Sequence, residues 1–161
     1  MIKRRKPIAR SGIKPKTERK KRAKSSLSAF KKKLWKKFSA FIKQRDGNIC
    51  FVCGKTPLIG NDWHAAHCFS AGKYPALRWR FDNVFSGCAK CNIWLKGNYI
   101  EYHDQYRKRF GEEAYKYLYD HRNDVKQWRL PDLMEIDAMI DMMSGGPGPE
   151  KTDGNSEVPI V

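Results

Sequence analysis

Four cysteines arranged in two pairs are the residues of this chain whose types and spacing indicate chemistry most directly. Cys50 and Cys53 form one C-x-x-C pair, and Cys88 and Cys91 form a second pair. Each pair lies in a turn that can present two sulfur atoms to one ion, so the two pairs together can complete a tetrahedral zinc site. The sequence therefore predicts one structural zinc ion held by four thiolates.

The segment between the two pairs, and the residue that follows them, carry the other candidate groups. These are two histidines, a basic aromatic patch and two asparagines: His64, His67, Arg78, Trp79, Arg80, Asn83 and Asn92. A neutral imidazole near pH 7 can accept a proton from water, so His67 is a candidate general base. Arginine suits phosphate binding, whereas Trp79 could either stack on a base or pack in a core.

This order of residues resembles that of the HNH, or ββα-metal, nucleases. From residue 40 to about residue 115 the chain is more specifically similar to the NinG family of lambdoid phages, which includes the lambda recombination endonuclease Rap. The resemblance rests on the sequences AFIKQRD, WHAAH, ALRWRFDNV, CAKCN, KGN and RFGEEA. It implies an α+β fold with a small zinc-pinned ββα-metal (HNH-like) core inside a mostly helical domain.

The same resemblance implies a function. The family relationship suggests a metal-dependent, structure-specific DNA endonuclease that hydrolyses phosphodiesters in branched recombination intermediates, such as D-loops and Holliday junctions. Two other functions stay open: a non-catalytic zinc-ribbon DNA-binding accessory protein of recombination, and an HNH nickase that acts on ordinary duplex DNA. Because a junction presents related strands, a symmetric homodimer would suit the first function.

The resemblance also assigns roles to single residues. His67 is the family's catalytic histidine, and Asn83 is expected to clamp the loop by bonding backbone across the hairpin and to orient His67. His64 and Asn92 are the candidate ligands of a catalytic Mg²⁺, Mn²⁺ or other divalent transition metal ion. His64 stands where the family commonly has aspartate, and strand alternation places it on the opposite side from His67 unless the strand bends.

The positive charge of the chain is concentrated near its N-terminus. The formal net charge is +16, and the first 37 residues hold 17 Lys or Arg and one acid. Such a cluster can neutralise phosphates, so residues 1–24 are expected to be a disordered basic DNA-binding arm; a solubilising or targeting tail is the alternative. Further DNA contacts are expected from the next helix and from Asn98, which could instead cap a helix. The helix residues are Lys31, Lys32, Lys33, Lys36 and Lys37.

Hydrophobic periodicity places the elements that must position these groups. A basic amphipathic helix is predicted over 25–47, with Gly47 as its C-cap. Strands are predicted over 62–68 and 84–87 within a zinc and ββα core spanning 50–98, whose helix starts near residue 90. C-terminal helices are predicted over 99–143, including one over 112–128 and one capped by Asp132. Residues 25–143 would form the endonuclease domain, and 144–161 a disordered tail.

The compartment follows from the absence of membrane signals in the sequence. No run approaches the roughly 20 apolar residues of a membrane span, and the basic N-terminus lacks the apolar region of a signal peptide. We therefore expect a protein of the bacterial cytoplasm with no membrane partner. In that compartment thiols stay reduced, which favours a zinc site over disulfides.

Overall fold

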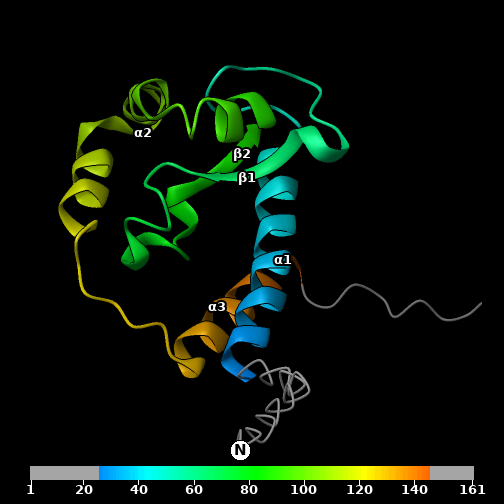
Figure 1. Cartoon of the computed structure of the whole chain (residues 1–161), viewed down its shortest axis with the longest axis vertical. Coiled ribbons are helices and arrows are strands. Elements are labelled where there is room, and N and C mark those ends of the chain that lie inside the picture. The colour runs from blue at the N-terminus through cyan, green and yellow to red at the C-terminus, as the bar shows by residue number, and fades with distance from the viewer. Residues whose placement is uncertain (1–25, 146–161) are drawn as a thin grey trace, which may run out of the picture.

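The computed structural model describes residues 26–145, and in this part of the chain helices surround a two-stranded antiparallel sheet (Figure 1). The elements are α1 (Ser26–Asp46), η1 (Gly60–Asp62), β1 (Trp63–His67), η2 (Pro75–Leu77), η3 (Phe81–Asn83), β2 (Val84–Cys88), the π-helical turn η4 (Lys90–Trp94), α2 (Tyr99–His121) and α3 (Leu130–Met143). The α+β composition is as predicted. The predicted arm over 1–24 and most of the predicted tail over 144–161 lie outside the described residues.

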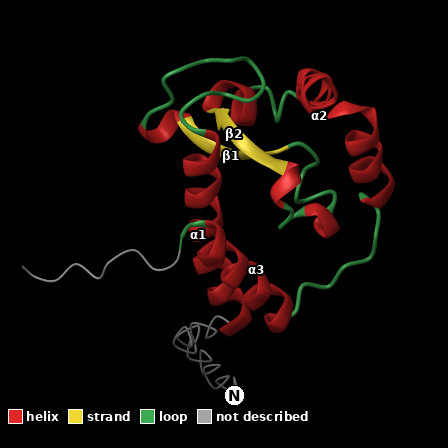
Figure 2. Cartoon of the chain, turned by 180° about the vertical axis from the view of Figure 1, so that it is seen from behind, coloured by secondary structure: helices red, strands yellow, loops and turns green. Residues whose placement is uncertain are grey.

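The hairpin lies at the centre of the described part and is covered on both faces (Figure 2). Strands β1 and β2 pair in register, with His67 opposite Val84 and Trp63 opposite Cys88. Because side chains alternate along a strand, Ala66 packs with α2 and the cysteines, whereas Ala65 packs with α1 and α3. The hairpin therefore separates two apolar clusters.

Helix α1 forms one of these clusters with α3 and one face of the hairpin. Its residues Leu34, Phe38 and Ile42 are buried at spacings of four, as the amphipathic pattern predicts. The helix ends at Asp46, and Gly47 follows with φ +71°, a left-handed conformation that favours glycine. The predicted helix and its C-cap are therefore confirmed.

The last two residues of α1 hold the outer edge of β2. Arg45 donates hydrogen bonds to the carbonyls of Phe81 and Val84, both at 2.8 Å. Asp46 pairs with Arg45 and accepts a hydrogen bond from the Ser86 amide at 2.8 Å. The Ser86 carbonyl accepts a further bond from the amide of Phe51. This edge of the small sheet is thus paired rather than open to solvent.

Helix α2 covers the other face of the hairpin and bends at Gly111. Gly111 has φ +87° and ψ 166°, so the helix changes direction at the residue where the sequence predicted an end. Before the kink, Tyr102 and Tyr106 are buried; after it, Tyr115 and Leu118 are buried. The Tyr102 hydroxyl donates to the carbonyl of Ala66 at 2.8 Å, which joins α2 to β1.

The predicted helix over 112–128 is too long. Helix α2 ends at His121, and the chain then runs over the surface to α3, held there by Trp128, whose indole donates to the Pro75 carbonyl. Val125, near the end of the predicted helix, is 97% exposed because it lies in this connection. Asp132 is also not the N-cap of α3: it is the N3 residue, and its carboxylate accepts from the amide of Arg129.

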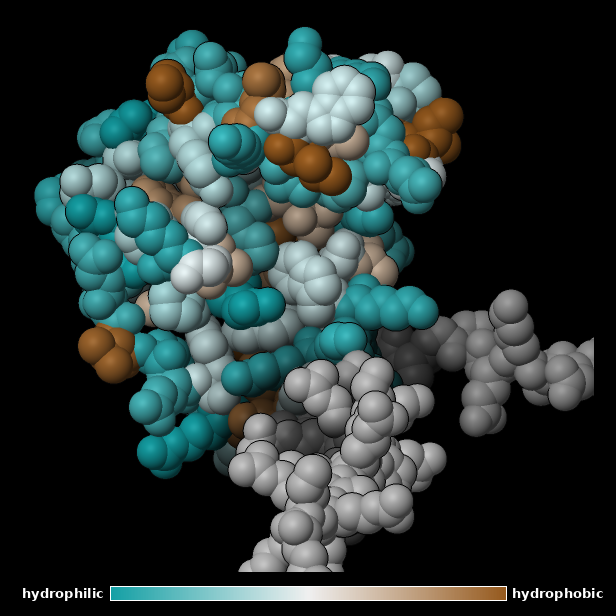
Figure 3. All heavy atoms as spheres, in the orientation of Figure 1, coloured by the Kyte–Doolittle hydropathy of each residue, from teal (hydrophilic) through white to brown (hydrophobic). Residues whose placement is uncertain are grey.

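The face of the molecule shown in Figure 3 is mainly hydrophilic. Apolar residues appear in one view as separate patches among polar ones (Figure 3). Within the described part of the chain, no helix combines the length and the apolar character that a bilayer crossing needs.

The edge contact of Asp46 predicts a stability effect. Replacing Asp46 by alanine leaves the buried Ser86 amide without its acceptor, and we expect a loss of about 1–3 kcal/mol in the free energy of unfolding. Urea unfolding measures this loss. As a matched control, Asp104→Ala removes only an exposed pair with Lys108 and should change the same quantity by about 0.5 kcal/mol or less. Equal effects of the two substitutions would contradict a special role for Asp46.

Candidate functional site

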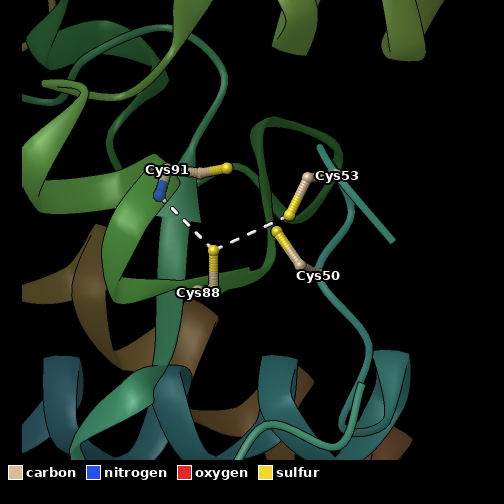
Figure 4. Close-up of side chains that lie close together, drawn as sticks. All are labelled: Cys50, Cys53, Cys88 and Cys91. Carbon is tan, nitrogen blue, oxygen red and sulfur yellow. Dashed lines mark hydrogen bonds between the residues drawn. The ribbon is translucent and has the colours of Figure 1, made fainter. Parts of the chain in front are cut away.

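The four paired cysteines converge as predicted. Cys50 and Cys53 come from the loop after α1, Cys88 ends β2, and Cys91 lies in η4; their side chains surround one common space (Figure 4). All four sulfur atoms lie within 4.8 Å of one another, and none is in a disulfide. The sulfurs of Cys53 and Cys88 are 3.8 Å apart, and a tetrahedron with Zn–S bonds of about 2.3 Å has S–S edges of about 3.8 Å.

The electrostatics of this cluster also fit a bound cation. Burial raises the pKa of the Cys91 thiol, and the neighbouring thiols of Cys88, Cys53 and Cys50 raise it further. At Cys50 burial acts in the same direction, but backbone amides outweigh it and lower the pKa of that thiol. Four thiolates at this spacing repel one another unless a cation lies between them, so the donor set fits one structural Zn²⁺.

Polar groups around the cluster hold the two turns in place. Asp62 accepts a hydrogen bond from the Ala89 amide at 3.0 Å and forms an ion pair with Lys55 at 2.7 Å. These contacts connect the first turn, the start of β1 and the second turn. Asn98 occupies the N-cap position of α2, but its side chain makes no capping hydrogen bond and lies 3.9 Å from the sulfur of Cys91. Asn98 therefore lies beside the cysteine cluster in this structure.

His67 is held at the end of β1 by two contacts. Its ring stacks on the Trp35 indole of α1, with centroids 5.2 Å apart and an interplanar angle of 13°. Its Nε2 lies 3.0 Å from the Arg78 carbonyl oxygen, which can only accept, so Nε2 carries the proton in this hydrogen bond. Burial and the charge of Arg78 lower the pKa of His67, while the hydrogen bond opposes this shift. The imidazole is therefore neutral at pH 7, with its lone pair on Nδ1.

Asn83 forms the contacts of a loop clamp. The side chain is fully buried, and its Oδ1 accepts from the Phe69 amide at 2.8 Å. Its Nδ2 donates to the carbonyls of Phe69 and Leu77, both at 3.0 Å. Because Leu77 immediately precedes Arg78, this amide fixes the carbonyl group that orients His67.

The other predicted catalytic residues are not brought together with His67. His64 lies on the face of β1 opposite to His67, and its Nε2 contacts the carbonyl of Asn61 at 2.9 Å. Asn92 is partly buried in η4, and within residues 26–145 no contact joins it to either histidine. The assignment of His64 and Asn92 as ligands of a catalytic divalent ion therefore stays a prediction.

The three residues of the basic aromatic patch differ in their exposure and in their partners. Arg78 is exposed, whereas Trp79 is buried between α1 and α3, the core alternative of the two that the sequence left open. Arg80 forms a two-pronged ion pair with Asp82, at 2.9 and 2.6 Å, and contacts the Tyr117 hydroxyl. Of the three, only Arg78 is exposed and clear of a carboxylate within residues 26–145.

The lysines of α1 also differ in their surroundings. Lys37 forms ion pairs with Asp137 and Asp141 of α3, at 2.6 and 2.8 Å, so it joins two helices. By contrast, Lys31 and Lys32 line an open depression of about 510 Å³ together with Trp35 and Arg78; Lys33 and Lys36 are exposed. This depression is next to His67, because Trp35 and Arg78 are the two residues that hold the imidazole.

Three residues that shape this region were missed by the sequence reasoning. Trp35 was not singled out, although it follows Leu34 at the border of the apolar stripe of α1, where an aromatic residue can contact both core and surface. Arg45 and Asp46 were quoted only as part of a similar sequence. Arg45 and Asp46 contact β2, which lies about 40 residues further along the chain, and no spacing of residues in the sequence near them predicts that contact.

Comparisons with known proteins point to one family. The family model described as "Bacteriophage Lambda NinG protein" matches residues 2–142. The chain is 30% identical over 101 residues to protein ninG of Escherichia phage lambda, covering 62% of this chain and 48% of that protein. It is also 30% identical over 101 residues to protein ninG of Escherichia phage 933W, covering 62% and 49%. The chain thus spans about half the length of the curated relatives it matches, and no solved structure matches it.

The cysteine cluster predicts the metal content. Purified protein should contain about one equivalent of zinc, and Cys88→Ser should lose the metal and most of the stability of the central region, since structural zinc contributes roughly 10 kcal/mol. Elemental analysis and urea unfolding measure both effects. The matched control is Cys68→Ser, because Cys68 is buried outside the cluster and should keep one equivalent. Full stability of a metal-free protein would refute the zinc site.

Proposed function

The chain belongs to the NinG family of bacteriophage proteins, and from this premise we propose that it is a structure-specific DNA endonuclease of recombination. Its substrates would be branched DNA intermediates, such as D-loops and Holliday junctions. The branch preference comes from the family resemblance, and a homodimer would match two related strands of a junction. Because the chain spans about half of its curated relatives, this activity is proposed for the described domain together with its basic N-terminal arm.

The observation that carries the proposal is the state of His67. Donation of the Nε2 proton to the Arg78 carbonyl leaves the Nδ1 lone pair available, and no described residue makes a hydrogen bond with Nδ1. Burial and the nearby charge of Arg78 keep the ring neutral. Such an imidazole can accept a proton from water as the water attacks phosphorus; the P–O3′ bond then breaks and the 3′ oxygen takes a proton from solvent, which gives a 5′-phosphate and a 3′-hydroxyl end.

The surroundings of His67 suit a phosphate backbone. Lys31, Lys32 and Arg78 line the adjacent depression, and none of them is in an ion pair with a carboxylate within the described residues. Their charges can neutralise a bound phosphate and hold the strand near the imidazole. Trp35 forms part of the same depression and fixes the ring plane of His67 by stacking. The proposed cleavage site therefore combines a neutral base with cationic phosphate contacts.

The family resemblance also implies a catalytic divalent cation, such as Mg²⁺ or Mn²⁺. Its expected ligands are His64 and Asn92, and no contact joins these two side chains within residues 26–145. The chain's own part in the proposed reaction is proton transfer at His67 and phosphate binding by Lys31, Lys32 and Arg78. The Zn²⁺ at the four cysteines would be structural, because all four of its coordination positions would be filled by thiolates.

The proposal predicts a separation of cleavage from binding. His67→Ala should lower the rate of cleavage of a labelled Holliday junction by roughly 100-fold or more, while the dissociation constant for the junction changes little. The base acts in the chemical step and contributes little to binding of the uncleaved strand. Gel assays of cleavage and binding on the same junction, with divalent metal ions supplied, measure both quantities.

His121→Ala is the matched control, because His121 is the exposed last residue of α2 and its ring contacts only Tyr117 within residues 26–145. It should cleave at the wild-type rate. Cleavage by His67→Ala within a few-fold of wild type would reject His67 as the base. Binding of the junction without cleavage by wild-type protein would favour the DNA-binding accessory function, and equal cleavage of the matched linear duplex would favour the nickase.

A further inference from the structure

A second pocket lies between the loop over residues 68–78 and helix α2. Its volume is about 290 Å³, near the lower end of the range for small-molecule sites. Half of its lining residues are Phe or Tyr, contributed by the loop and by both halves of α2: Phe69, Tyr74, Tyr99, Tyr115 and Tyr119. The proposed catalytic reaction uses none of these side chains.

The floor of this aromatic pocket is rigid, and its polar groups are already paired. Phe69 is buried and stacks on His103, with centroids 4.7 Å apart. The His103 Nε2 lies 3.2 Å from the carbonyl of Cys68, so it carries the proton, and Nδ1 accepts from the Tyr115 hydroxyl at 3.2 Å. A ligand would therefore meet ring faces on the floor rather than free donors and acceptors.

Two exposed tyrosines form the walls. Tyr99 is 39% exposed and Tyr119 is 44% exposed, although both rings are held in place. A Cβ atom at Gly97 would lie 2.6 Å from the Tyr99 ring, so only glycine lets this ring lie against the backbone there. The guanidinium of Arg122 lies over the Tyr119 ring, 3.4 Å from its centroid. The walls are thus positioned but leave aromatic surface open to solvent.

The charge of the pocket indicates the kind of ligand it favours. Lys73 and Arg122 are among its lining residues, and no Asp or Glu is. Within residues 26–145, neither Lys73 nor Arg122 forms an ion pair with a carboxylate. A flat ring that carries a negative charge matches aromatic walls beside two cations, and a nucleotide has both features.

We propose that this aromatic pocket binds one unpaired nucleotide of a DNA strand. Its base would stack against Tyr99 and Tyr119, and its phosphate would contact Lys73 and Arg122. Base pairing and stacking in a duplex keep bases out of such a pocket, whereas a branch point exposes unpaired bases. The paired polar groups of the floor predict tolerance of any base rather than recognition of one. This inference rests on the proposed function and names the feature of the substrate that the protein would recognise.

The position of the pocket relative to His67 supports this use. Cys68 lines the pocket and directly follows His67, while Arg78, at the other end of the same loop, orients His67. The side chain of Asn83 bonds both Phe69 in the pocket floor and Leu77 beside Arg78. One loop therefore separates the pocket from the proposed cleavage site, and a strand bound at both would be cut close to its unpaired nucleotide.

The test compares single-stranded with duplex DNA in binding experiments. All proteins carry His67→Ala so that no probe is cut, and the probes are fluorescein-labelled oligothymidylate of about ten nucleotides and a duplex of equal length. At about 0.15 M ionic strength, long-range attraction by the basic arm is reduced. We expect Tyr119→Ala to weaken single-strand binding by about tenfold or more, with duplex binding unchanged. Tyr119→Phe, which keeps the ring, should bind like the parent protein.

Tyr117→Ala is the matched control, because Tyr117 is also on α2 and 47% exposed but contacts Arg80 instead of the pocket. It should leave single-strand affinity unchanged. Unchanged single-strand affinity in Tyr119→Ala and in Tyr99→Ala would overturn the proposal, as would equal losses for single strand and duplex. Because these experiments measure binding without cleavage, their result stands apart from the nuclease proposal, which the cleavage assays on branched and linear DNA test.

Two further probes identify other occupants. NMR spectra of the tyrosine rings report binding at the pocket directly. Deoxythymidine monophosphate should shift the Tyr119 ring signals only weakly, since it lacks the neighbouring phosphates of a strand. Tighter binding of this mononucleotide than of the oligonucleotide would assign the pocket to a free nucleotide and overturn the proposal. If an oligoproline peptide shifts the Tyr119 ring signals and neither the mononucleotide nor the oligonucleotide does, the pocket binds a peptide and the proposal is also overturned.

Discussion

The buried amide of Asn83 is the interaction on which the proposed site depends most. Its three hydrogen bonds to Phe69 and Leu77 hold both sides of the loop over residues 68–78. Through Leu77 the amide fixes the carbonyl of Arg78 and hence His67, and through Phe69 it fixes the floor of the aromatic pocket. A buried backbone group without a partner is costly, so this loop has few alternative conformations as long as Asn83 is in place.

The opposite end of the hairpin is held by the cysteine cluster. Cys88 is the last residue of β2, and the sulfurs of Cys50 and Cys53 approach it from the loop after α1. If this cluster holds a zinc ion, metal–sulfur bonds would fix turns that bury little apolar surface and would help a two-stranded sheet keep its register in so small a domain. Both faces of the hairpin are then available for helices, and the Arg45–Asp46 pair completes its outer edge.

The sequence predicted the features that depend on local spacing. The two cysteine pairs, the burial pattern of α1 and the hairpin strands all follow from periods of two to four residues. The contacts missed join residues far apart in the chain: Trp35 with His67, Asp46 with Ser86, and Phe69 with Tyr115. Tertiary packing also changed the role of one predicted DNA-binding residue. Lys37 belongs to a run of lysines that suits phosphate binding, but it forms an ion pair with Asp137 of α3. Tertiary packing determines these contacts, and the spacing of residues along the sequence does not predict them.

The pH dependence of single-turnover cleavage of branched DNA tests the central claim, that His67 is the base, most directly. The rate should rise as the imidazole loses its proton, with an apparent pKa below the usual value of about 6.5, because burial and Arg78 lower the pKa of His67. NMR titration of the His67 ring in the same protein should give the same value. An inflection that does not coincide with the His67 titration, or the absence of cleavage at every pH, would contradict the account.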